Sequence, residues 1–323
     1  MSTTTSFFIP VQDQIHQIEI LMRSQSDGQH QDLQAALEHL LASGGKRIRP
    51  TVTLLVGQML GASEEALITL AASIELLHTA TLVHDDLIDG SLLRRGMPTL
   101  NARWTPGATV LTGDFIFARA AKLAADTNSI PVMSLFAKTL GTIVNGEITQ
   151  LFTSRCQSNR EDYYQRIYAK TASLFEAAVI CAALISPANP DQVEWVHQYG
   201  YNIGMAFQIV DDVFDFIGDQ TRLGKPVGSD LRQGLITLPT IYYIEDHPED
   251  ANAQEIANGN CLKYDDQIAE IVEHIRSSNA IEQSLNEADG FVHNALRCLD
   301  NLPNGPENEH LQELTQYITR RNI

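Results

Sequence analysis

The sequence contains few cysteines and few positive charges for its length of 323 residues. Its four cysteines, Cys156, Cys181, Cys261 and Cys298, are widely separated and form no CxxC pair. Because this spacing suggests neither a zinc site nor a disulfide framework, we expect reduced thiols in a cytoplasmic protein. The 40 acidic residues outnumber the 22 basic ones and give a net charge of −18. This charge argues against a nucleic-acid partner and against general binding to anionic lipid.

Long apolar runs and targeting signals are also missing. No stretch of about 18 consecutive apolar residues occurs, so we expect no transmembrane segment and leave open only a loose association with membranes. The first residues, MSTTTSFFIPVQDQ, lack a basic region followed by an apolar stretch, which argues against a secretory signal. Hydrophobic residues still make up 44% of the chain, which is enough for a large core.

Proline (12 residues) and aromatic residues (7%) are scarce, and no long segment alternates polar and apolar residues as a strand would. Apolar residues recur instead at helical spacing through most of the chain. The predicted helices are one that ends on the glycines of 37–45, then 63–89, 107–126, 130–153, 161–186, 191–217, 232–246, one or two within 262–300, and 307–320.

Three of these helices, at 63–89, 130–153 and 191–217, are apolar nearly all round, which is typical of the centre of a large bundle. The segment 218–230 contains glycine, proline and charges and is a predicted loop, and the polar segment 247–262 is a predicted surface insert. No stretch resembles an interdomain linker. We therefore predict an all-α fold, with one helical domain covering residues 1–323.

Six aspartates form two similar motifs, each at the end of an apolar helix. DDLID contains Asp85, Asp86 and Asp89, and DDVFD contains Asp211, Asp212 and Asp215. In each motif the first and last aspartates are four residues apart, so on a helix they share a face and repel each other. A bound cation would relieve that repulsion, and carboxylate oxygens suit Mg²⁺, which also shares its ligand positions with substrate phosphates.

Basic residues gather at a few places in this acidic chain. GGKRIRP (44–50) follows two glycines, LLRRG supplies Arg94 and Arg95, Lys170 precedes Thr171 within a predicted helix, and Lys225 lies in the loop after the second aspartate motif. Arginine and lysine at such positions favour binding of phosphate groups. Neither GxxxxGK[ST] nor GxGxxG after a strand occurs, so these phosphates are predicted to belong to something other than a nucleotide.

Several stretches resemble the trans-isoprenyl diphosphate synthases, also called polyprenyl synthetases. The similar stretches, in the order found in that family, are GGKRIRP, LLHTATLVHDDLIDGSLLRRGMPTLN, TGDFIFARA, GEITQ, AKTASLF, GMAFQIVDDVFDFIGD and GKPVGSDLRQGLITLP. The resemblance implies an all-α bundle with a central elongation cavity. It also implies a reaction in which an allylic diphosphate ionises, isopentenyl diphosphate attacks the cation, and a proton is lost.

The resemblance assigns roles to particular residues. Asp85, Asp89 and Asp211 are implied metal ligands for three Mg²⁺ ions, with Asp86, Asp212 and Asp215 as direct or supporting partners. Isopentenyl diphosphate is implied to bind Lys46, Arg49, His78 and Arg95. The allylic diphosphate primer is implied to bind Arg94, Lys170, Thr171, Gln208 and Lys225, and Lys170 is counted with the aspartates among the catalytic residues. Members of the family are usually homodimers, so we expect a second copy as partner.

One position departs from the family pattern. After DLRQG the family often has a lysine, but this chain has Leu235 and Ile236. One diphosphate contact is therefore either missing or supplied by Arg232.

The residues before the first aspartate motif bear on product length. Short-chain members carry bulky aromatic residues one helical turn before that motif, whereas this chain has Ala80 and Thr81. An open path along the helix, deepening by about 5.4 Å per turn, would let the product grow long. The expected product is a quinone side-chain precursor such as solanesyl (C45) diphosphate, as in solanesyl or octaprenyl diphosphate synthases. Floor candidates on the facing helix are Phe136, Leu140 and Ile143.

Several alternatives stay open. Small residues at 80 and 81 could serve close helix packing, in which case the product would be shorter, such as geranylgeranyl or farnesyl diphosphate. Terpene cyclases share the helical fold and a first aspartate motif, but they do not need the residues implied to bind isopentenyl diphosphate. A non-catalytic subunit of a heteromeric synthase typically loses aspartates, whereas this chain keeps all six.

Overall fold

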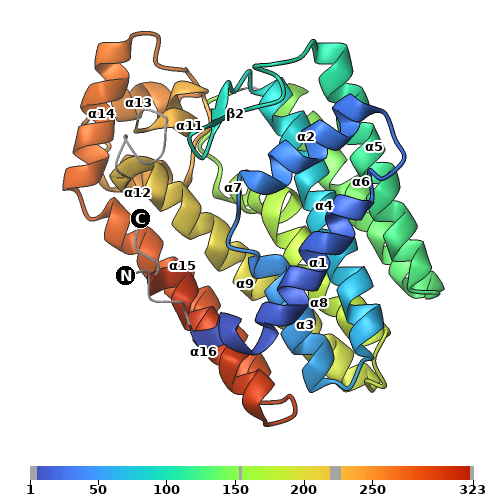
Figure 1. Ribbon diagram of the computed structural model, residues 1–323. Coiled ribbons are helices and arrows are strands. Elements are labelled where there is room, and N and C mark those ends of the chain that lie inside the picture. The colour runs from blue at the N-terminus through green and yellow to red at the C-terminus, as the bar shows by residue number, and fades with distance from the viewer. Residues whose placement is uncertain (1–5, 153–154, 219–226, 321–323) are drawn as a thin grey trace. The chain divides into compact units, whose positions relative to one another are not determined.

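The computed structural model describes residues 6–152, 155–218 and 227–320, and most of their regular structure is helical (Figure 1). The predicted all-α fold is therefore confirmed, and the strands of the described residues form only a two-stranded antiparallel hairpin. Contacts between residues divide the chain into two compact units. The expectation of one domain over residues 1–323 stays a prediction.

The first unit contains Met1–Thr139, Leu174–Gly200 and Cys298–Leu314. Its elements are a 3₁₀ turn at Ser6–Val11, α1 (Gln12–Ser24), α2 (Gln31–Ala42), α3 (Ile48–Met59), α4 (Glu64–Ile88), β1 (Leu93–Arg94), β2 (Met97–Pro98), α5 (Pro106–Asp126), the first part of α6 (Ile130–Phe152), nearly all of α8 (Ser173–Leu184) and the first part of α9 (Pro190–Ile217). The end of α15 (Ala280–Leu299) and the first part of α16 (Pro306–Arg320) also belong to this unit.

The second unit contains Leu140–Ser173, Tyr201–Arg297 and Thr315–Ile323. Besides the remaining parts of α6 and α9, its elements are α7 (Arg160–Ile167), a π-helical turn at Tyr168–Ala172, α11 (Ser229–Arg232), α12 (Leu238–Asp246), α13 (Ala251–Ala257), α14 (Asp265–Ser277), most of α15 (Ala280–Leu299) and the end of α16 (Pro306–Arg320).

Helix α4 is the central helix of the first unit and carries the first aspartate motif. It begins where the Ser63 side chain accepts a hydrogen bond from the Ala66 amide, with two glutamates in its first turn. Most of its side chains are buried on all sides, as its composition predicts. It packs closely on α5 at Gly113, where an added Cβ would lie 2.1 Å from His84 Nε2. A larger residue there would require the His84 ring to move.

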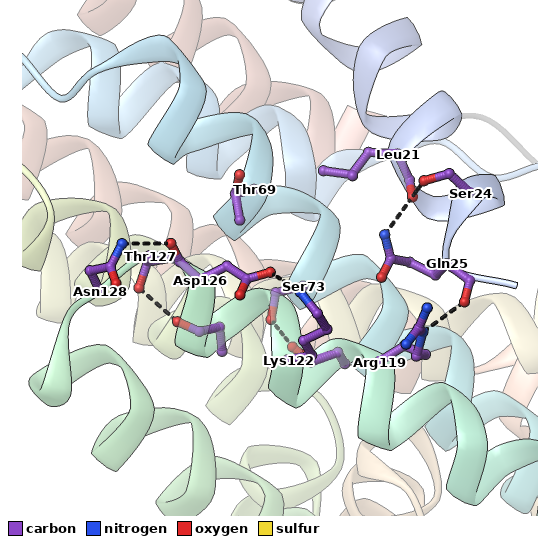
Figure 2. Close-up of polar contacts among 12 residues, drawn as sticks. Leu21, Ser24, Gln25, Thr69, Ser73, Arg119, Lys122, Asp126, Thr127 and Asn128 are labelled. Atoms are coloured by element: carbon purple, nitrogen blue, oxygen red, sulfur yellow. Dashed lines mark hydrogen bonds and ion pairs between the residues drawn. The ribbon is translucent and has the colours of Figure 1, made fainter. Parts of the chain in front are cut away.

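Polar contacts fix α4 and α5 against each other and α5 against the end of α1 (Figure 2). The buried Ser73 hydroxyl donates to the Ala120 carbonyl at 2.8 Å, which joins α4 to α5. Arg119 Nε donates to the Gln25 carbonyl at 2.6 Å. Ser73 therefore serves close helix packing, the explanation that the sequence left open for positions 80 and 81 of the same helix.

The core of the second unit forms around the last turns of α9. Ile209, Val210 and Phe216 of this helix are fully buried, together with Ile271 and Ile275 of α14. Helices α12, α13 and α14 pack on one another in the same unit. Since α9 ends in the second aspartate motif, this core sets the position of that motif.

Two helical segments of the described residues, Glu64–Ile88 and Arg160–Leu184, are long and apolar enough to cross a membrane by length and composition alone. In each, most of the apolar window is buried inside the protein, 67% and 72% respectively. Burial of this extent is what the core helices of a globular protein show, so the two segments are weak evidence for membrane insertion.

The structure differs from the sequence-based expectations in the region after the second motif. The helix predicted at 232–246 is wrong in its first half, because the chain turns at Gly234 (φ 77°) and α12 begins only at Leu238, next to Pro239. The predicted polar insert at 247–262 contains α13, whose Ala253 and Ile256 are buried.

The expectation of four reduced cysteines is also wrong. Cys156 and Cys261 form a disulfide across 105 residues of sequence, whereas Cys181 and Cys298 are buried thiols. Spacing along the sequence did not reveal the pair, since only the tertiary fold of the second unit brings the two segments together.

Candidate active site

The first aspartate motif occupies the last turn of α4. Its middle member, Asp86, is buried and receives Arg94 in a two-pronged contact. Arg94 Nε lies 3.0 Å from both carboxylate oxygens of Asp86, and Nη2 lies 2.9 Å from Oδ1. Asp85 is half-buried and Asp89, which caps the helix, is exposed. The two outer carboxylates therefore lie nearer to solvent than the middle one.

Arg94, which the resemblance assigns to the allylic diphosphate, pairs with Asp86 in the structure. The short hairpin β1–β2 follows the motif and brings Arg94 back onto Asp86. The ion pair neutralises a carboxylate whose burial would otherwise be costly. A role for Arg94 at a diphosphate stays a prediction.

The second motif, in the last turns of α9, likewise has a buried middle aspartate and more exposed outer aspartates. Asp212 is buried, and both of its carboxylate oxygens accept hydrogen bonds: Oδ2 from the Tyr163 hydroxyl at 2.8 Å and Oδ1 from Gln208 Nε2 at 2.7 Å. Asp211 and Asp215 are half-buried. Asp215 Oδ2 accepts a hydrogen bond from the Asp230 amide at 3.0 Å, which fixes the start of α11 beside the motif.

The environment of Asp212 disfavours its charge. Burial, and next the negative charge of Asp230, raise the pKa of Asp212 to about 8, although the hydrogen bonds from Gln208 and Tyr163 act in the opposite direction. Tyr163 is itself almost fully buried, and burial together with Asp212 raises the pKa of its hydroxyl well above the usual value. The hydroxyl therefore stays a donor. The contact between Tyr163 and Asp212 was not predicted, because the two residues are 49 positions apart in the sequence.

A π-helical turn positions Lys170 and Thr171. It interrupts the helical run between α7 and α8 over Tyr168–Ala172, and such turns are frequent at functional sites. The Thr171 hydroxyl donates to Gln208 Oε1 at 2.6 Å, and Lys170 Nζ lies 3.3 Å from Glu147 Oε1. Three predicted site residues, Thr171, Gln208 and Asp212, thus form one hydrogen-bonded chain in the second unit. Lys225 lies outside the described residues.

The residues implied to bind isopentenyl diphosphate come together in the first unit. His78 of α4 lies in the field of Arg49 and Arg95: burial first, then the charges of Arg49, Arg95, Arg94 and Arg47, lower its pKa well below the usual value. The imidazole is therefore neutral at pH 7 without an anion nearby. Arg95 donates to the Gly44 carbonyl, which brings it to the GGKRIRP segment, where Lys46 is exposed.

Arg47 of the same segment has a structural role. Its Nε lies 3.0 Å from Glu19 Oε1 of α1 and its Nη1 lies 3.0 Å from Glu75 Oε1 of α4. This buried double ion pair joins the start of α3 to two other helices. Arg49, in contrast, stacks on the Phe175 ring with its guanidinium carbon 4.5 Å from the ring centre.

Arg232 does not point to the position of the missing lysine. Its Nη1 donates to Asp265 Oδ1 of α14 at 2.8 Å. Arg166 of α7 instead donates to the Ile236 carbonyl. A cationic side chain therefore does lie at Leu235–Ile236, but it comes from another helix.

The residues predicted to set product length fall in both units. Ala80, Phe136 and Ile143 are buried, whereas Thr81 and Leu140 are half-buried. The Thr81 hydroxyl donates to the His78 carbonyl of its own helix at 2.7 Å. The elongation cavity and its floor stay predictions.

The donor set fits a hard divalent cation that is completed by other ligands. Among the described residues, no three His, Cys, Asp or Glu side chains are grouped closely enough to hold a metal ion by themselves. The outer aspartates of each motif nevertheless supply carboxylate oxygens at half-exposed or exposed positions. Mg²⁺ commonly takes one or two carboxylates and fills its other positions with water and substrate phosphate.

The chain is similar to known proteins over most of its length. The model of the family "Polyprenyl synthetase" matches residues 30–275. The chain is 37% identical to heptaprenyl diphosphate synthase component 2 of Geobacillus stearothermophilus over 289 residues, which cover 89% of each protein. It is 36% identical to octaprenyl diphosphate synthase of Escherichia coli K12, with 88% of each covered.

Among solved structures, the polyprenyl synthase from Caulobacter crescentus CB15, complexed with calcium and isoprenyl diphosphate, superposes with a TM-score of 0.91 at 33% identity. The superposition covers 98% of this chain and 97% of that one. The fold, the two aspartate motifs and these similarities agree, and the chain is a prenyltransferase that belongs to the polyprenyl synthetase family.

Proposed function

We propose that this prenyltransferase adds isopentenyl diphosphate repeatedly to an allylic diphosphate and makes a long all-trans prenyl diphosphate for a quinone side chain. The observation that carries the proposal is the common arrangement of the two aspartate motifs. In each, a buried middle aspartate is held by protein donors and the outer aspartates lie closer to solvent. Such an arrangement suits two acidic groups that share polyphosphate substrates through metal ions.

Divalent metal is part of this proposal, and the Caulobacter relative is complexed with calcium. Asp85, Asp89 and Asp211 would hold Mg²⁺, three ions being expected with substrate bound. Bound Mg²⁺ would supply positive charge to the departing diphosphate. Lys170, Thr171 and Gln208 would orient the allylic diphosphate, and Lys46, Arg49, His78 and Arg95 the isopentenyl diphosphate. The departing diphosphate would take the proton lost after condensation.

Two observations support a long product. A small buried alanine, Ala80, stands where short-chain members of the family carry a bulky aromatic residue. Two relatives are named for heptaprenyl and octaprenyl products. A shorter product, geranylgeranyl or farnesyl diphosphate, is the alternative if the small side chains of α4 serve helix packing alone. At position 73 the small side chain does serve packing, because the Ser73 hydroxyl joins α4 to α5. This observation favours the shorter product.

A second copy of the chain is the partner we propose. In the second unit, one face of α6 exposes Val144, Ile148, Leu151 and Phe152, with Phe152 87% exposed. Apolar side chains in a continuous stripe are typical of an interface. The name "component 2" of the Geobacillus relative points to the alternative of a different partner subunit. Light scattering of the purified chain distinguishes a dimer from a monomer.

Incubation with labelled isopentenyl diphosphate tests the proposal. With Mg²⁺ and an allylic primer, the chain alone should incorporate label, and EDTA should abolish incorporation. A terpene cyclase would leave the label unused, and so would a non-catalytic subunit. Absence of incorporation with every primer tried would overturn the catalytic assignment.

A further inference from the structure

The disulfide of the second unit joins two loops rather than two helices. Cys156 lies in the turn before α7, and Cys261 lies between the end of α13 and the start of α14. Cys156 is buried, whereas Cys261 is exposed. Because Cys261 is the exposed partner, its sulfur is the one that a thiol from solution would attack. Cleavage would free two loops and leave the helices intact.

The other two cysteines are poorly suited to exchange with this pair. Cys181 and Cys298 are buried thiols of the first unit. Burial raises the pKa of the Cys181 thiol to about 12, so its thiolate, the reactive form, is scarce at neutral pH. An external reductant would therefore act on the Cys156–Cys261 pair.

The disulfide helps to maintain an unfavourable backbone conformation at Cys156. The φ of Cys156, 63°, lies in the left-handed region, which residues other than glycine seldom adopt. Cys156 is held by the disulfide and by the hydrogen bond from its amide to the Gly234 carbonyl, 2.8 Å long. Such a conformation persists only where the surroundings enforce it. Loss of the disulfide would therefore favour movement of segment 155–157.

The turn at Gly234 packs directly on this segment. A Cβ added to Gly234 would lie 3.2 Å from Cys156 Sγ and 3.0 Å from the Arg155 Cβ. The turn leads into Leu235 and Ile236, where the family often has a lysine. Movement of segment 155–157 would therefore disturb the turn and the residues that follow it.

Backbone hydrogen bonds continue from this turn to the second aspartate motif. The Leu235 amide donates to the Asp230 carbonyl at 2.9 Å. The Asp230 amide donates to Asp215 Oδ2 at 3.0 Å, and the Gly228 amide donates to the Asp215 carbonyl at 2.8 Å. The disulfide is thus connected to an outer aspartate of the motif through the turn at Gly234 and through α11.

We propose that the Cys156–Cys261 pair is a redox switch for the second aspartate motif. The disulfide keeps Asp215 in place, and reduction loosens the turn at Gly234 and α11 and so weakens the metal site. The inference rests on the proposed function, in which this motif holds divalent metal. Groups that orient metal ligands affect metal affinity, and changes between disulfide and thiols are a known way to switch a protein.

The reductant of this switch is a dithiol. One of its thiolates attacks Cys261 Sγ, forms a mixed disulfide and releases Cys156 as a thiolate, which takes up a proton. The second thiol of the reductant then attacks the reductant's own sulfur in the mixed disulfide and releases Cys261 as a thiol. Two electrons and two protons pass from the dithiol to the protein, and the dithiol leaves as its own disulfide.

Hydrogen exchange of the oxidised and reduced protein tests this inference. The full-length protein is compared in EDTA before and after treatment with dithiothreitol, and free thiols are counted, two in the oxidised form and four in the reduced form. Peptides that cover 155–157 and 228–236 should exchange about tenfold faster or more after reduction, because local opening is easier without the cross-link. Peptides that cover 280–297 of α15, in the same unit, should not change.

Two variants serve as controls. The double variant Cys156→Ser, Cys261→Ser should exchange as the reduced wild type does, and dithiothreitol should not alter it. Cys181→Ala also removes a sulfur but keeps the disulfide, so its peptides should respond to dithiothreitol as those of the wild type do. Unchanged exchange at 228–236 in the reduced wild type, or equal acceleration in α15, would overturn the inference. A pair that stays reduced after treatment with an oxidised dithiol would also overturn it.

The initial rate as a function of Mg²⁺ concentration gives a second readout. Reduction should raise the half-saturating Mg²⁺ concentration of the wild type by about threefold or more, because the groups that orient a metal ligand lose order. It should leave the double variant unchanged. Equal Mg²⁺ dependence of the oxidised and reduced wild type would overturn the inference. Absence of label incorporation in both forms bears on the proposed function alone, and the exchange data, which need no metal or substrate, then decide this inference.

Discussion

Asp86 and Asp212 occupy the middle position of their motifs, and both are buried against protein donors. One is paired with an arginine and the other receives a tyrosine hydroxyl and a glutamine amide. In both motifs these contacts offset the cost of burying a carboxylate, although the side chains that supply them differ. We therefore expect these two aspartates to orient the motifs and the outer aspartates to reach a ligand.

Tyr163→Phe tests this role in the second motif. The substitution removes one donor from the buried Asp212 and should raise the half-saturating Mg²⁺ concentration of the reaction by about tenfold, as loss of an outer-shell partner does. The readout is the initial rate as a function of Mg²⁺ concentration, which a loss of stability alone would not shift. The control is Tyr243→Phe, which removes a similar contact, 2.9 Å long, to Asp250. Equal Mg²⁺ dependence in the two variants would contradict the account.

His78 makes stability depend on pH. Its pKa in the folded protein is depressed by burial and by neighbouring arginines, so below its unfolded pKa of about 6.5 the unfolded chain binds a proton that the folded protein does not. Stability should therefore fall as pH drops below about 6.5, by up to about 1.4 kcal/mol per pH unit from this group. Urea unfolding at pH 7 and 5.5 should show a smaller loss in His78→Gln than in the wild type.

The control for this measurement is His16→Gln, which alters an exposed histidine of α1. Its loss of stability on acidification should match that of the wild type. If both histidine variants lose stability equally, His78 is not the source of the pH dependence.

The residue types and spacing of the site could be predicted from the sequence, but several of its contacts could not. Helical spacing correctly placed Asp85 and Asp89 in one turn. The pairing of Arg94 with Asp86 depends on a hairpin too short to leave a periodic pattern. The contact of Tyr163 with Asp212 joins different helices, and no local pattern encodes it.

At the scale of elements, long apolar helices were predictable and irregular segments were not. The bounds of α4, α5, α6 and α9 agree with the predicted ranges to within about two residues, because their apolar faces extend over many turns. The π-helical turn at Tyr168–Ala172 and the turn at Gly234 were missed. Both arise from tertiary contacts and backbone conformation, which apolar periodicity does not report.

The disulfide should stabilise the second unit. It joins residues 105 apart, and closing a loop of this length restricts the unfolded chain, with typical gains of about 2–4 kcal/mol. Reduction should therefore lower the melting temperature of the wild type. The double variant Cys156→Ser, Cys261→Ser should melt earlier than the oxidised wild type and show no further change on reduction.

A wild-type melting temperature that is insensitive to reductant would show that the pair is not oxidised in solution. The same comparison bears on cellular location, because disulfides are rare in the cytoplasm of most organisms.

At the scale of the whole molecule, the composition and the family pattern predicted the helical fold and the reaction class. The division into two units was not apparent, since neither α6 nor α9 carries a break where its residues pass from one unit to the other. The predicted product length rests on side-chain packing around Ala80 and Thr81, which no local pattern determines.

Ala80→Phe tests the predicted path of the growing chain. A phenyl ring one turn before the first motif should block elongation and shorten the product to about three or four isoprene units, since each helical turn deepens the path by about 5.4 Å. Because Ala80 is buried, circular dichroism must show that the variant is folded. Thr81→Phe, at a half-buried position, provides a second block.

The most direct measurement is the length of the product made from labelled isopentenyl diphosphate. Chromatographic sizing of the wild-type product should give a prenyl chain of about seven or more units, as the names of the relatives suggest, and the Ala80→Phe product should be shorter. A wild-type product no longer than geranylgeranyl diphosphate, or equal lengths from the two proteins, would contradict the account.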